Sequence, residues 1–109
     1  MATAELALAL PAVILVLALC LTGLTLAVDQ IRCEDAARVA ARAASRGEPG
    51  PLVRELALSR APQRSAVTVS TGEGTVLVVV EAPARDRHLR ALPAAVARAE
   101  AVLEPGVTP

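Results

Sequence analysis

One uninterrupted apolar segment, Leu6 to Val28, constrains this chain more than any other feature. The hydrocarbon core of a bilayer is about 30 Å thick, and a helix rising about 1.5 Å per residue needs about 20 apolar residues to cross it. The segment contains no charged residue and meets that length. We therefore expect residues 6–28 to span a membrane or to form the core of a secretion signal, with the rest of the chain on one side.

Beyond this segment, only one small domain can form, and it contains no Phe, Tyr or Trp. Aromatic side chains bury the largest area per residue, so a core of Val, Leu and Ala is expected to be thin and only marginally stable. All basic residues are Arg, and the net charge is zero. Long-range attraction to nucleic acid is therefore not expected.

The two cysteines, Cys20 and Cys33, do not form a disulfide framework. If both lie on one helix, they are about 20 Å apart, too far for a bridge. We interpret them as small, unpaired, buried residues, with a disulfide between two copies of the chain as the open alternative.

The helix is predicted to continue beyond the membrane, since residues 29–46 contain no Gly or Pro. Gly47, followed by Pro49 and Pro51, is expected to end it. This divides the chain into a long helix, residues 1–46, and a small domain, residues 47–109. Within the span, Pro11 removes one backbone hydrogen bond and is expected to bend the helix, and Gly23 provides a point for close helix packing.

Three arginines in the outer half of this helix, Arg38, Arg42 and Arg46, recur every fourth residue and so share one face. Alanines and Val39 occupy another face. The arginine face is interpreted as solvated with contact to lipid headgroups, or alternatively as a docking surface for acidic partners.

The remaining chain has the pattern of a small α+β domain. Residues 52–60 form a short amphipathic helix whose apolar face is expected to cover a sheet. Two β-branched segments, residues 65–71 and 75–82, flank Gly72-Glu-Gly74 and predict a β-hairpin. Residues 76–80 are apolar at every position, which predicts a central strand covered on both faces.

The segment from Pro93 to Glu104 has two readings. Its alanine content favours a helix, whereas its alternation places Ala95, Ala97, Ala99, Ala101 and Leu103 on one face of a strand. Because a central strand requires a second neighbour, a third strand is favoured. The predicted fold class is thus α+β, with a long N-terminal helix, a short helix and a three-stranded antiparallel sheet.

No catalytic constellation is present: the chain lacks a phosphate-binding loop, metal-ligand spacing and an activated nucleophile. The single histidine, His88, lies among charged residues and is interpreted as a solvated loop residue. We expect no enzyme activity, no cofactor and no metal.

Glu5 is the most informative polar residue, because a carboxylate at the start of an apolar helix is costly in hydrocarbon unless it is paired. It can interact with the helix dipole, or it can pair with a positive group on another subunit.

The N-terminal residues resemble a known family. Residues 1–5 followed directly by an apolar helix are similar to the mature N-terminus of a type IV pilin, which prepilin peptidase leaves with Glu at the fifth position. The fuller pattern resembles the TadE-like minor pilins or pseudopilins of Tad (Flp-type IVb) pili in high-GC Gram-positive bacteria. The resemblance is close in the first half and holds in outline in the second, and these segments carry it: Thr3 to Ala7, Leu10-Pro11, Cys33 to Arg38 and Ala41 to Glu48.

The resemblance implies a structural role in the pilus or its assembly, with other pilin subunits, the assembly machinery and membrane lipid as partners. It also implies that Glu5 neutralises the amino group of Met1 on an adjacent subunit. No basic leader ending in Gly precedes Met1, so we expect either the mature form or a start at an internal Met codon.

Arg32 and the three arginines beyond it follow the span, which by itself would keep the domain in the cytoplasm. A basic leader would reverse this bias, giving a single-pass protein of the cytoplasmic membrane with an extracytoplasmic domain. The alternative is a secreted or single-pass anchored small extracytoplasmic binding module unrelated to pili, with cleavage after Ala27.

Overall fold

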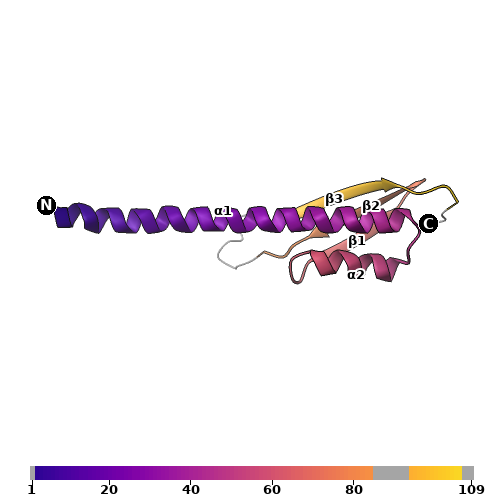
Figure 1. Ribbon diagram of the computed structural model, residues 1–109, viewed down its shortest axis with the longest axis horizontal. Helices are drawn as coiled ribbons and strands as arrows, with labels where there is room; N and C mark the ends of the chain where they lie inside the picture. Colours follow the sequence, from indigo (N-terminus) through magenta and orange to yellow (C-terminus); the bar gives the residue numbers. More distant parts are fainter. Residues whose placement is uncertain (1, 85–93, 107–109) are drawn as a thin grey trace.

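The computed structural model describes residues 2–84 and 94–106, and its dominant element is one long helix (Figure 1). Helix α1, Ala2–Ser45, runs without interruption through Pro11 and Gly23, and the molecule measures 77 × 21 × 20 Å. The prediction that the helix continues past the apolar segment is confirmed. The last turns of α1 are therefore as much a part of the folded domain as the strands beside them.

Gly47 ends α1 through a Schellman motif. The N–H of Gly47 donates to the carbonyl of Ala44 at 3.0 Å, and the N–H of Glu48 donates to that of Ala43 at 3.3 Å. This geometry requires a left-handed residue, which glycine adopts without strain, and Gly47 has a φ of 84°. The chain then turns into helix α2, Gly50–Arg60, with Pro51 in its first turn.

Three strands follow and form one antiparallel sheet in the order β1-β2-β3. Strands β1, Ala66–Thr71, and β2, Thr75–Glu81, make the predicted hairpin, with Thr71 opposite Val76. Strand β3, Val96–Val102, pairs with the other side of β2, with Val78 opposite Ala99. The strand prediction for this segment is confirmed over Val96–Val102, and β2 is the central strand as expected.

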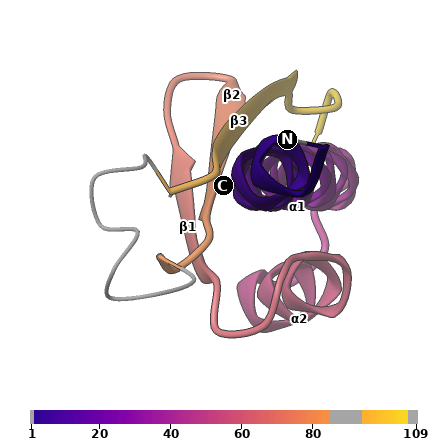
Figure 2. The same cartoon turned by 90° about the vertical axis from the view of Figure 1, so that its left-hand side faces the viewer.

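Both helices lie on the same side of the sheet (Figure 2). The C-terminal half of α1 packs on β2 and β3, and α2 packs on α1 and β1. The long helix is thus the main cover of the sheet, whereas the sequence pattern had assigned this role to the short helix.

The prediction that β2 is covered on both faces is wrong. Val76, Val78 and Val80 are buried under the helices, but Leu77 and Val79 on the opposite face are only half-buried. No element among the described residues covers that second face. Leu77 and Val79 are partly buried because the neighbouring strands β1 and β3 flank them on both sides.

The core consists almost entirely of small side chains. Its members come from α1, α2 and the sheet, and the fully buried residues of α1 are Cys33, Ala36, Ala37 and Ala40. Because alanine projects only one methyl group, the helix backbone can approach the strands closely. Packing therefore depends on close approach and not on large side chains.

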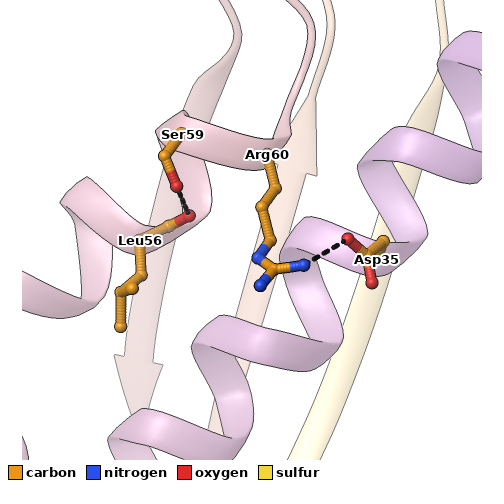
Figure 3. Close-up of polar contacts among 4 residues, drawn as sticks. All are labelled: Asp35, Leu56, Ser59 and Arg60. Atoms are coloured by element: carbon orange, nitrogen blue, oxygen red, sulfur yellow. Dashed lines mark hydrogen bonds and ion pairs between the residues drawn. The ribbon is translucent and has the colours of Figure 1, made fainter.

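Polar contacts connect α1 to the rest of the domain at several points. The Nε2 of Gln30 donates to the carbonyl of Val96 at 2.8 Å, and the N–H of Glu104 donates to the carbonyl of Ser45 at 3.0 Å. Arg60 of α2 pairs with Asp35 of α1 at 3.2 Å (Figure 3). These contacts join segments far apart in sequence and link β3 and α2 to the helix.

Candidate functional site: the exposed span of α1 and its junction with the domain

Residues 6–28 of α1, called here the exposed span, project from the domain as a bare helix (Figure 1). Their large aliphatic side chains are exposed except for the half-buried Leu26, with Leu8 at 79% and Leu10 at 54%. Among the described residues, α1 is the one helix that is long and apolar enough to cross a membrane, and none of its most apolar 18-residue window is buried. Such a surface requires lipid or protein around it in water.

The side-chain hydroxyl groups of the exposed span are satisfied within the helix itself. The hydroxyl groups of Thr22 and Thr25 donate to the carbonyls of Ala18 and Leu21, each at 2.8 Å. An apolar environment tolerates a helix only when its polar groups are paired internally. The exposed span therefore has the chemistry that a lipid bilayer or an apolar helix bundle demands.

Glu5 lies in the first turn of α1 and is exposed. It immediately precedes Leu6, so its carboxylate sits at the end of the apolar surface next to the unpaired N–H groups of the helix N-terminus. Met1, its expected counterpart on a neighbouring subunit, lies outside the described residues. The pairing role of Met1 and Glu5 stays a prediction.

Pro11 and Gly23 both lie within the exposed span and on the open surface of the molecule. A Cβ atom added at Gly23 would meet nothing within 4 Å. Space for a neighbouring helix is thus open at Gly23, and the kink and packing roles of both residues stay predictions.

The arginine face lies on the other half of α1, where Arg38, Arg42 and Arg46 are all exposed. Arg46 pairs with Glu48 at 3.7 Å. Neither Arg38 nor Arg42 has a carboxylate within 4 Å among the residues that the structure describes. Their charge is directed to the surroundings, and their contact with lipid or acidic partners stays a prediction.

Sequence reasoning missed Asp29, the first residue after the exposed span, which is only 3% exposed. It lines a cleft of about 430 Å³ together with Arg32 on α1 and Pro62 and Arg64 on the connection from α2 to β1. Its position on the same helical stripe as Cys33 and Ala36 is the signal that could have revealed its burial. The junction between span and domain is therefore charged on the inside as well as on the surface.

Cys33 lies one turn beyond Asp29 and is completely buried, as expected, whereas the expected burial of Cys20 is wrong, because Cys20 lies on the bare part of α1 and is exposed. Both are free thiols. Burial raises the pKa of the Cys33 thiol, and the nearby Asp29 carboxylate raises it further, although a hydrogen bond from the backbone of Ala82 acts in the opposite direction. The thiol is therefore held protonated, and Cys33 acts as a small core residue. The state of Cys20 in an assembly stays a prediction.

Within residues 2–84 and 94–106, no three His, Cys, Asp or Glu side chains are grouped so that they could hold a metal ion. His88, interpreted above as a solvated loop residue, lies outside the described residues.

These features define a class of protein: a small α+β domain carried at the end of a long N-terminal helix whose first half is a bare apolar surface. The sequence model of the TadE-like protein family matches residues 1–42, which is nearly the whole of α1. Apoptosis inhibitor Rv3655c of Mycobacterium tuberculosis is 42% identical over 106 residues, covering 95% of this chain and 80% of that protein. The chain belongs to the TadE-like protein family. No solved structure matches it.

Proposed function

We propose that this protein is a minor pilin, a pseudopilin or an assembly factor of a Tad-type type IV pilus, with a structural and not an enzymatic role. Its partners are other pilin subunits, the pilus assembly machinery and membrane lipid. Before incorporation it resides in the cytoplasmic membrane, crossing it once through residues 6–28 with the α+β domain outside. If a leader precedes Met1, prepilin peptidase removes it.

The exposed span is the observation that carries this proposal. Its large apolar side chains point outward around the helix, and all of those from Leu6 to Leu24 are more than half exposed. Lipid can cover this surface while the protein is stored, and the equivalent helices of neighbouring subunits can cover it after assembly. An ordinary membrane anchor needs only the state in which lipid covers this surface. The proposal therefore depends on a feature that acts when the helices of neighbouring subunits cover it.

Glu5 is that feature. In an assembled core, its carboxylate neutralises the amino group of Met1 on an adjacent subunit, where an unpaired charge would cost several kcal/mol. In a simple anchor, Glu5 contributes only about 0.3 to 1 kcal/mol through the helix dipole. The two roles therefore differ in the expected effect of removing the charge.

The test is the Glu5→Gln variant, assayed for pilus assembly or for co-purification with other pilus subunits at matched protein level. Breaking a buried ion pair costs about 3 to 5 kcal/mol, so association is expected to fall by about two orders of magnitude or more. The matched control is Glu55→Gln on the exposed surface of α2, which is expected to assemble normally. Normal assembly of Glu5→Gln would contradict the pairing role.

Intact-mass analysis of the protein from its native host tests processing and anchoring. A chain that begins at Met1 after loss of a leader is expected. A chain that begins near Val28 would instead identify residues 6–28 as a cleaved secretion signal and overturn the pilin assignment.

A further inference from the structure

The sheet has two edge strands, and the hydrogen-bond register identifies which backbone groups each edge presents. The N–H of Gly72 donates to the carbonyl of Thr75 at 2.8 Å, so this pair and every second pair along the hairpin are the hydrogen-bonded ones. The backbone N–H and C=O groups of Ala66, Thr68 and Ser70 consequently point toward β2. The N–H and C=O groups of Val67, Val69 and Thr71 point away from the sheet, and we call them the open edge.

The opposite edge, on β3, is closed by α1 at its two ends, and the charged residues Arg98 and Glu100 lie between them. The same reasoning applies to β3, because the N–H of Ala82 donates to the carbonyl of Ala95 at 2.8 Å. The backbone N–H and C=O groups of Val96 and of the even-numbered residues after it therefore point outward. The Val96 carbonyl accepts a hydrogen bond from Gln30, and the N–H of Glu104 donates to Ser45. Helix α1 thus occupies both ends of this edge.

The open edge has no such closure. Within residues 2–84 and 94–106, none of its backbone groups has a hydrogen-bond partner. Strand β1 also lacks the features that usually prevent edge pairing, since it contains no charged residue and no proline, and its one-to-one register with β2 contains no bulge. An uncharged, β-branched edge of about 20 Å is a template for another strand.

A hollow of about 200 Å³ lies beside the distal end of the open edge, between the helices and the sheet. Val69 and Thr71 of β1 line it together with Val53 of α2 and Leu103 after β3, and Glu48 is the one charged residue among its described lining residues. An extended segment placed along β1 would direct every second side chain toward this side of the sheet. The hollow can therefore receive an apolar side chain from such a segment.

We propose that the open edge binds a β-strand of a different protein chain, which pairs antiparallel to β1 and adds a fourth strand to the sheet. The partner segment is uncharged where it faces β1, with an apolar side chain for the hollow and small or polar side chains beside Thr68 and Ser70. Backbone hydrogen bonds supply the attachment, and the alternating side chains supply the specificity.

Geometry argues against a second copy of this chain as the occupant. The strands run lengthwise along the C-terminal half of α1 (Figure 1). Because β1 and β3 are both antiparallel to β2, they run parallel to each other, and antiparallel pairing of β1 with either edge strand of another copy requires the second α1 to point the opposite way. Two copies anchored in one membrane cannot satisfy this arrangement; this step rests on the anchoring proposed above, whereas the open edge itself does not.

Amide hydrogen exchange on the full chain tests the occupancy directly. In the detergent-solubilised monomer, the N–H groups of Val67, Val69 and Thr71 are expected to exchange at least about tenfold faster than those of Thr68 and Ser70, which face β2. In native membranes with the partner present, the three edge groups are expected to slow by at least about tenfold. Unchanged fast exchange in native membranes would overturn the proposal.

A photoreactive side chain at Thr68 identifies the occupant, with the same label at Val102 on the β3 side as the control. Crosslinking from Thr68 to a different chain, absent from Val102, is expected. Crosslinking to a second copy of this protein would overturn the choice of occupant. This readout is independent of Glu5→Gln, since it detects the strand partner whether or not a pilus is assembled.

Val69→Pro and Thr71→Pro each remove one edge N–H without removing a hydrogen bond to β2. Both are expected to abolish the Thr68 crosslink while the sheet remains folded. Thr71 is exposed, so its variant spares the core if Val69→Pro does not fold. The matched control, Arg98→Pro, removes an outward N–H from the closed edge and is expected to crosslink normally. Normal crosslinking by folded Thr71→Pro would contradict the proposal.

Discussion

The two halves of α1 are parts of one continuous helix, yet they are built for opposite surroundings. Residues 6–28 expose leucine, valine and isoleucine side chains around the helix, whereas the half from Asp29 to Ser45 buries mainly alanine. The larger and more hydrophobic side chains are thus the exposed ones. In this protein, large apolar side chains mark the part of α1 that an apolar environment can surround. Small side chains mark the part of α1 that the strands approach closely.

This contrast has a physical basis in the neighbours of each half. A sheet packed on a helix is a fixed surface, so small side chains such as Ala36 and Ala40 let the backbones come close and exclude water. Lipid or parallel helices can adjust to large aliphatic side chains. Substitutions that are equivalent in chemistry should therefore have unequal effects in the two regions.

The largest effect is expected from Val78→Asp, because Val78 is completely buried in the centre of β2. The new carboxylate would be buried without a partner, at a cost of about 3 to 5 kcal/mol, which is most of the stability of a domain this small. Thermal melting of the full chain in detergent, followed by circular dichroism, should lose its cooperative transition. The helical signal of the exposed span should persist.

Val102→Asp is the control for this substitution, since Val102 is on the same sheet but 74% exposed. It is expected to melt within a few degrees of the parent. If Val78→Asp also melts like the parent, the burial of β2 under α1 is contradicted.

A smaller effect is expected from enlarging alanine at equivalent places in the two halves. Ala40 is completely buried against the sheet, so Ala40→Leu overpacks the interface and should destabilise the domain by about 1 to 3 kcal/mol. Ala12→Leu makes the same change in the exposed span and should leave the melting temperature of the domain unchanged. Equal melting of the two variants would show that the halves do not differ in packing.

The smallest effect is expected for the ion pair between Arg60 and Asp35, which joins α2 to α1 at 3.2 Å (Figure 3). Both side chains are about half exposed, at 52% and 54%, so solvent and salt screen their attraction. Arg60→Gln should lower the free energy of unfolding by less than about 1 kcal/mol, and 1 M salt should reduce the difference further. A loss as large as that of Ala40→Leu would mean that α2 depends on this contact for its position.

The features of the candidate site also differ in whether they depend on local sequence or on tertiary structure. The exposed span, Glu5, Pro11, Gly23 and the arginine face all depend on local sequence, and α1 places each of them on the exposed surface. The burial of Asp29 depends on local sequence only in part. Its helical stripe with Cys33 and Ala36 indicates the buried side, but the segments that cover it, the α2-to-β1 connection and the residues after β2, are brought there by tertiary structure. The open edge of β1 likewise depends on strand order, which no single segment encodes.

Local periodicity and turn chemistry could be predicted from the sequence: the length of α1, its end at Gly47, the hairpin at Gly72 to Gly74 and the alternation of residues 95–103 all follow from interactions between near neighbours in the chain. The alternation and the need of β2 for a second neighbour favoured a strand for β3, and its pairing with β2 confirms it. Tertiary structure gave the main cover of the sheet to α1 and left one face of β2 without a layer. The apolar pattern of residues 76–80 could not show that one face of β2 lacks a covering layer. Apolar side chains at every position indicate a strand between two others, but they do not indicate how many layers pack on it.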